Sequence, residues 1–173
     1  MDKKTIIQKQ LALLEGVLVN EFRTCQSLQD IVAGERLALS QGNVPKLSNL
    51  VEEKEVLLDQ LGQIEDERRK AVQELSLALE ENSETPTVFS LLSRLNSEVA
   101  GRLGRLCDGI STIVGQVRQY NDGNQALAAS ALERVDIVQN YLLSLIQIPE
   151  NYQPPGSHPI PVQSIVWDFD QKA

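Results

Sequence analysis

The sequence predicts an all-α fold: an antiparallel helical hairpin and a long third helix that form an elongated three-helix coiled-coil bundle, followed by an extended, proline-rich C-terminal tail. Apolar residues recur at spacings of three and four over most of the chain, which is the spacing of one helix face. Only 4% of the 173 residues are aromatic, so leucine, valine, isoleucine and alanine dominate the apolar residues, as suits helix-on-helix packing. Glycine and proline interrupt the pattern, and five of the seven prolines follow residue 148.

The first two helices are expected over residues 2–41 and 45–82. Between them, Gly42 and Asn43 are typical of a helix C-terminus, and Pro45 is typical of the first turn of the next helix. Because the link is so short, the two helices should form an antiparallel hairpin.

A third helix is expected over residues 86–147. Thr85 has the residue type of an N-cap, and Pro86 suits the first helical position. This divides the chain into a helical domain, residues 1–148, and a tail, residues 149–173.

Charged residues within the apolar stripes propose a register for the hairpin. When residues whose numbers sum to 89 are paired, apolar positions face each other, Glu21 faces Arg68 and Glu35 faces Lys54. One interpretation is that these pairs fix the register, as polar groups do in coiled coils. The other is that the long side chains reach solvent at the bundle edge and contribute about 0–1 kcal/mol each.

The stretch QYNDGNQ, residues 119–125, has the composition of a tight turn inside the third helix. The apolar spacing keeps its phase across it, so we expect a continuous helix in which Asn121 and Asn124 form part of a polar layer. A break at 121–124, with the last helix folded back, is the alternative. From the helix lengths, about 90 Å against about 60 Å, Asn124 should lie level with Val44 at the hairpin tip, and the residues after it should project past the bundle.

The projecting part of the third helix carries an apolar stripe without a predicted partner. Such a face is typical of a protein-binding site, here for a client protein, although a homodimer or a folded-back fourth helix would also cover it. The predicted client-binding residues are Leu127, Ala131, Val135, Val138, Leu142 and Leu145.

Composition and motifs argue against several function classes. The net charge of −8 argues against nucleic acid and anionic membranes as partners, and no apolar run approaches the ~20 residues that span a bilayer. Signal-peptide features are absent from the N-terminus, so we expect a cytoplasmic protein. Cys25 and Cys107 lie on apolar stripes as small hydrophobic residues. The single histidine, His158, has no metal-ligand cluster, phosphate loop or catalytic triad around it, so we expect no enzyme, cofactor or metal.

The hairpin resembles the FlgN family of flagellar export chaperones over residues 34–72, and two shorter stretches, QYNDGNQAL and NYQPPG, are similar to the family as well. The family-like positions of the hairpin are Glu35, Ala38, Leu39, Gly42, Asn43, Leu47, Leu50, Lys54, Glu55, Leu57, Leu58, Leu61 and Arg68.

The resemblance implies a cytoplasmic chaperone of flagellar type III secretion. Such a chaperone binds the C-terminal helical segments of hook–filament junction (hook-associated) proteins through its own C-terminal helical region, prevents their premature assembly and delivers them to the export gate. Tyr152 and Gly156 would correspond to a gate-docking element, although Tyr152 could instead cap the helix end. The extension around Trp167 goes beyond the family pattern and could cover the client face, contact a second copy or contact the gate. The rival function is a structural coiled-coil adaptor or homodimerisation module.

Overall fold

The computed structural model describes residues 3–81 and 85–146, which form helices and no strand. The helices are α1 (Lys3–Gln41), α2 (Val44–Ala78), α3 (Val88–Leu92) and α4 (Ser97–Ile146). This confirms the all-α fold class. The chain divides into two compact units, Met1–Leu132 and Glu133–Ala173, and α4 contributes to both.

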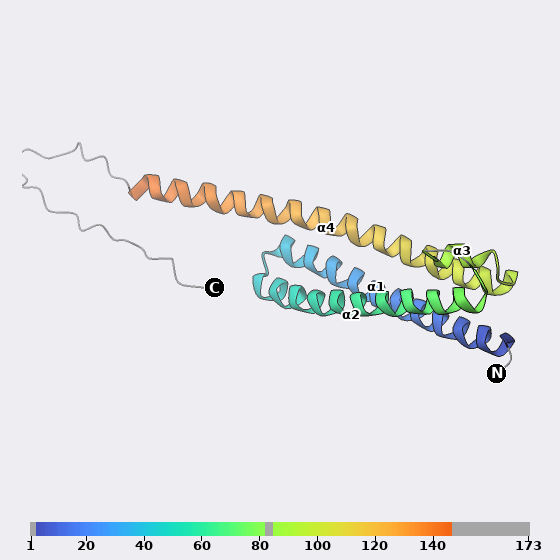
Figure 1. The fold of residues 1–173 in the computed structure, drawn as a ribbon. Helices are drawn as coiled ribbons and strands as arrows, with labels where there is room; N and C mark the ends of the chain where they lie inside the picture. The colour runs from blue at the N-terminus through green and yellow to red at the C-terminus, as the bar shows by residue number, and fades with distance from the viewer. Residues whose placement is uncertain (1–2, 82–84, 147–173) are drawn as a thin grey trace, which may run out of the picture. The chain divides into compact units, whose positions relative to one another are not determined.

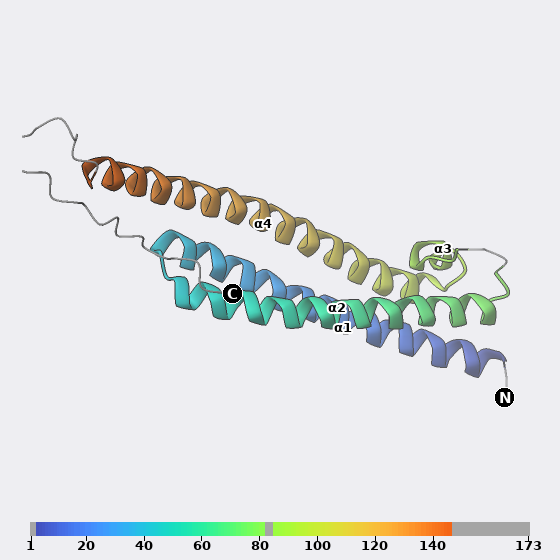
Figure 2. The same ribbon diagram turned by 60° about the vertical axis from the view of Figure 1, so that its left-hand side comes forward.

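Helices α1 and α2 form the antiparallel hairpin that the short link predicts (Figures 1 and 2). Gly42 ends α1 with a φ of +63°, a left-handed conformation that glycine adopts without steric cost. The amide of Asn43 donates to the carbonyl of Ala38 at 2.9 Å, which closes a Schellman motif. The Asn43 side chain then accepts from the amide of Lys46 and caps α2, which has Pro45 in its first turn.

Helix α2 ends four residues before the predicted position. Glu80 has a φ of +57°, and the amide of Glu81 donates to the carbonyl of Ser76 at 3.0 Å. A left-handed residue therefore ends this helix as well, but here it is a glutamate. Because glycine is the usual residue at such a position, the sequence carried no clear signal for this end.

The third predicted helix is not continuous from residue 86. Thr87, rather than Thr85, is the N-cap of α3, where it forms a capping box with Ser90. After a turn, the side chain of Asn96 accepts from the amide of Val99 at 2.8 Å and starts α4. The apolar spacing continues through this turn, which hid the break. Helix α4 then runs without interruption through residues 119–125, as the sequence predicts.

The core of the first unit consists of two apolar clusters. One lies near the beginning of α1 and contains the fully buried Leu14, Leu75, Leu91 and Leu103. The other, nearer the hairpin turn, is centred on Val32. Burying one such leucine contributes about 1.5–3 kcal/mol. The buried residues of α2 all lie at or after Ile64, so the half of this helix next to the hairpin turn is thinly covered.

Helices α1 and α4 pack in parallel with a regular register. Glu15 and Arg102 form an ion pair, and Gln29 and Gln116 form a hydrogen bond of 2.8 Å; both pairs are 87 residues apart. The same offset brings the Phe22 ring onto Gly109 and the Arg36 guanidinium onto Gly123. These four contacts recur every seven residues, which is the repeat of a coiled coil.

This register corrects the predicted level of Asn124. The 87-residue offset places Asn43, in the hairpin turn, level with Ser130, so Asn124 lies about two helical turns before the tip. The predicted level was wrong because α4 starts at Ser97 rather than at residue 86, and α3 and the following turn occupy the residues before it.

Candidate functional site

A buried polar layer joins α1, α2 and α4. Lys54 Nζ lies 3.1 and 3.2 Å from the two carboxylate oxygens of Glu35, the partner that the hairpin register predicts, and 2.7 Å from Asn121 Oδ1. Asn124 Nδ2 donates to the carbonyl of Val32 at 2.8 Å and to Glu35 at 3.3 Å. The Glu35 side chain is 5% exposed, so its charge depends on these partners.

Such a layer contributes to specificity more than to net stability. Removing two charges from water costs several kcal/mol, which their attraction roughly offsets. Asn124 Oδ1 is buried and accepts no hydrogen bond from the described residues, which adds to the cost. A displaced register would separate Lys54 from both Glu35 and Asn121, so the layer favours the observed one.

The second predicted pair, Glu21 and Arg68, has a longer contact between its charged groups than Glu35 and Lys54. Arg68 Nε lies 3.5 Å from Glu21 but donates its hydrogen bonds to Glu65, a partner that the sequence reasoning missed. Burial raises the pKa of Glu21, Arg68 opposes this shift and Glu65 adds to it. Glu21 is therefore a partly desolvated carboxylate rather than half of a matched pair.

The other candidate reactive groups have the environment of structural residues. Cys25 and Cys107 are free thiols, and burial raises the pKa of each, which disfavours the reactive thiolate. Across residues 3–81 and 85–146, no three histidine, cysteine, aspartate or glutamate side chains cluster as metal ligands. None of the described helices is long and apolar enough to cross a membrane.

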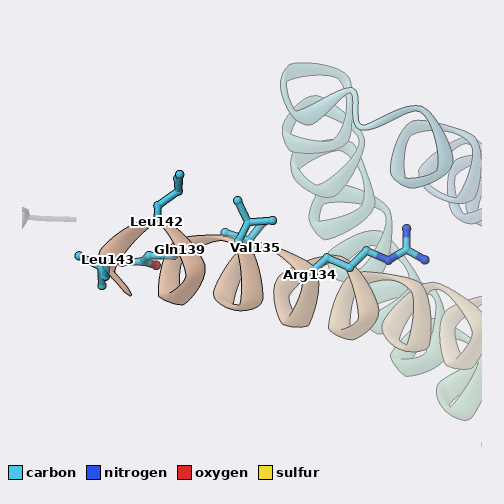
Figure 3. Close-up of a pocket in the computed structure, with 6 residues that line it drawn as sticks. Arg134, Val135, Gln139, Leu142 and Leu143 are labelled. Atoms are coloured by element: carbon cyan, nitrogen blue, oxygen red, sulfur yellow. The ribbon is translucent and has the colours of Figure 1, made fainter. Parts of the chain in front are cut away.

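The predicted client stripe is exposed on α4. In the second unit, Val135, Val138, Leu142 and Leu145 are between 52% and 60% exposed. At about 100° per residue these four lie within one sector of about 80°, and Figure 3 shows Val135 and Leu142 on the same side of the helix. Leu127 and Ala131, the first two predicted members, belong to the first unit; Leu127 is 37% exposed.

The apolar surface is wider than the predicted stripe. Leu143 flanks it on one side, Ile137 and Tyr141 on the other, and each is at least 50% exposed. Following a single series of three- and four-residue steps misses these flanks; plotting every residue around the helix axis would have found them. The polar residues Glu133, Asp136, Asn140 and Ser144 occupy the remaining narrow strip.

We call the residues Val135, Val138, Leu142 and Leu145 the apolar face of α4. Arg134 borders this face at its N-terminal end, as Figure 3 shows. Arg134 is the only cation between residues 133 and 146. The face therefore offers an apolar surface with one positively charged end, which suits an apolar segment that also carries an acidic residue. The predicted gate-docking residues, Tyr152 and Gly156, and the extension around Trp167 lie outside the described residues.

Comparisons with known proteins point to one family. The family model for FlgN protein matches residues 5–159. The chain is 25% identical over 140 residues to the uncharacterized protein YvyG of Bacillus subtilis (strain 168), an alignment that covers 79% of this chain and 82% of that protein. No solved structure matches the chain.

Proposed function

Because the chain belongs to the FlgN family of flagellar export chaperones, we propose that it binds hook–filament junction (hook-associated) proteins in the cytoplasm. It captures their C-terminal helical segments, prevents premature assembly and delivers them to the export gate.

The observation that carries this proposal is the apolar face of α4. A contiguous apolar surface of this kind marks an interaction site more often than a free surface. Anchors at positions 135, 138, 142 and 145 have the spacing by which a helix receives an amphipathic partner helix.

The physical mechanism is coupled folding and binding. A client segment that is disordered alone buries its apolar side chains on this face and becomes ordered there. The cost of that ordering, about 2–5 kcal/mol, keeps the affinity below the value that the buried surface alone would give. A client bound in this way is protected from assembly but is still released during export.

A change at the centre of the face tests this proposal. Val135→Asp combined with Leu142→Asp removes two apolar anchors of about 1.5–3 kcal/mol each and introduces two charges, so client affinity should fall by at least ~100-fold. Binding of a purified hook-associated protein is measured by calorimetry, and circular dichroism checks that the helices remain folded.

The matched control places the same residue types elsewhere on the surface. Val56→Asp combined with Leu77→Asp alters exposed apolar residues of α2, 57% and 71% exposed, and should leave client affinity unchanged. Client binding that is equal in both double variants would reject the face as the client site. A tight dimer that loses its association in Val135→Asp/Leu142→Asp, together with no client binding, would favour the adaptor function.

The export-gate step needs a separate experiment. We assign it to Tyr152 and Gly156 because similar positions follow the last helix in the family. Tyr152→Ala should leave client affinity unchanged and reduce secretion of hook-associated proteins into the medium. Normal secretion by this variant would reject the assignment without affecting the client site.

A further inference from the structure

The apolar face of α4 has a second candidate occupant in the same chain. The segment Ile160–Phe169, IPVQSIVWDF, contains six large apolar residues in ten: Ile160, Val162, Ile165, Val166, Trp167 and Phe169. It lies beyond residue 159, where the match to the family model ends, so the family comparison accounts for none of it. Exposing an apolar segment of this density to water costs free energy, so burying it against another apolar surface is favourable.

Charge complementarity favours the α4 face as its binding surface. Asp168 follows Trp167 directly, and Asp170 comes two residues later. Arg134, at the N-terminal end of the apolar face, makes no ion pair with any described residue. The segment is therefore apolar with an acidic end, and the surface is apolar with a basic end.

The lengths of the linker and of the segment permit this pairing when the segment runs antiparallel to α4. Residues 147–159 link the end of α4 to the segment, and thirteen residues reach up to about 43 Å. From Leu143 back to Arg134 the helix rises about 14 Å. An extended segment from Val162 to Trp167 spans about 17 Å. A segment running antiparallel to α4 thus covers the face and brings Asp168 and Asp170 to Arg134.

We propose that residues 160–169 bind the apolar face of α4 in cis, and, resting on the client function proposed above, that they compete with the client for it. The occupant is tethered, so its effective concentration is in the millimolar range. An intrinsic dissociation constant of about 0.1 mM would then lower client affinity about tenfold. Residues 160–169 would cover the apolar face of α4 in the absence of a client and would be displaced by a client that binds more tightly.

Trp167 is the only tryptophan of the chain and reports on this contact without any client. In the full chain its fluorescence should be blue-shifted and poorly quenched by acrylamide. Val135→Asp/Leu142→Asp should shift the emission to the red and increase quenching several-fold, whereas the control Val56→Asp/Leu77→Asp should change neither. Equal quenching in all three proteins would overturn the proposal.

A charge swap tests the direction of the segment. Asp168→Lys combined with Asp170→Lys should expose Trp167, and adding Arg134→Glu should restore its protection. If Arg134→Glu restores nothing, the antiparallel arrangement is wrong. Protection that disappears on dilution, together with dissociation of a dimer in sedimentation, would overturn the contact in cis and assign the face to a second copy.

Client competition is measured with the full chain. Val166→Ser combined with Trp167→Ser should bind a purified hook-associated protein about tenfold more tightly than the unmodified chain, and Gln163→Ser should not. Unchanged affinity would overturn the competition. Failure of every variant to bind the client would instead reject the proposed function, and the Trp167 fluorescence would still decide whether the segment binds the face.

Discussion

Removing Lys54 should expose how strongly the buried polar layer depends on one ammonium group. Lys54→Met deletes the contacts of 3.1 and 3.2 Å to Glu35 and the contact of 2.7 Å to Asn121. Glu35 stays 95% buried, with Asn124 Nδ2 at 3.3 Å as its remaining side-chain donor among the described residues. Breaking a buried pair in this way costs about 3–5 kcal/mol, a large part of a total stability of about 5–15 kcal/mol.

Urea denaturation followed by circular dichroism measures this cost. With a slope of about 2 kcal/mol per molar urea, the unfolding midpoint of Lys54→Met should fall by about 2 M. The double variant Glu35→Met/Lys54→Met removes both charges and should return most of the stability, because the desolvation cost disappears with them. Lys3→Met is the control, since its ion pair with Glu80 is exposed, and its midpoint should not move. A midpoint for Lys54→Met within about 0.3 M of the unmodified protein would refute the dependence of Glu35 on Lys54.

Two further predictions concern the first unit. A Cβ atom at Gly109 would lie 2.8 Å from the Phe22 ring, so Gly109→Ala should destabilise the unit by about 1–3 kcal/mol. Gly115 has open space around it, so Gly115→Ala should stabilise α4 by about 0.5–1 kcal/mol. Thermal unfolding that ranks the two variants in the opposite order would contradict the α1–α4 register. Burial raises the pKa of Glu21 in the folded state, so this group favours folding below its unfolded pKa, and the benefit is lost as pH rises through the folded pKa. Glu21→Gln should therefore be more stable than the unmodified protein at pH 7, and this difference in stability should shrink as the pH falls below the folded pKa. A stability difference that grows on acidification would show that the attraction of Arg68 dominates instead.

The features that the sequence predicted correctly depend on local chemistry. Gly42, Asn43 and Pro45 each favour one backbone conformation, so the hairpin turn could be located from residue types alone. The unbroken spacing across residues 119–125 was likewise sufficient to predict a continuous helix. The pairing of Glu35 with Lys54 followed from the hairpin register, because a short turn leaves few alternatives.

The features that the sequence did not predict depend on competition between local signals and packing. Glu80 takes a left-handed conformation without the glycine that would announce it. The turn between α3 and α4 keeps the apolar spacing, because Leu92 before it, Leu95 within it and Val99 after it pack against the same core. The missed turn then displaced the predicted level of Asn124 by about two helical turns. On the site, the exposed flanks of the α4 face escaped a search that followed a single series of apolar residues.

The uneven cover of α2 has a consequence for the order in which the first unit opens. From Val44 to Gln63 this helix has no buried residue, whereas Ala71, Val72 and Leu75 are buried in the apolar cluster near the beginning of α1. Local unfolding follows such gradients, so amide hydrogen exchange should be fastest next to the hairpin turn and slowest around Leu75. Lys54 lies within the thinly covered half, which makes the polar layer the contact that delays its fraying. The bundle would thus open first at the hairpin turn, while the apolar cluster around Leu75 stays folded.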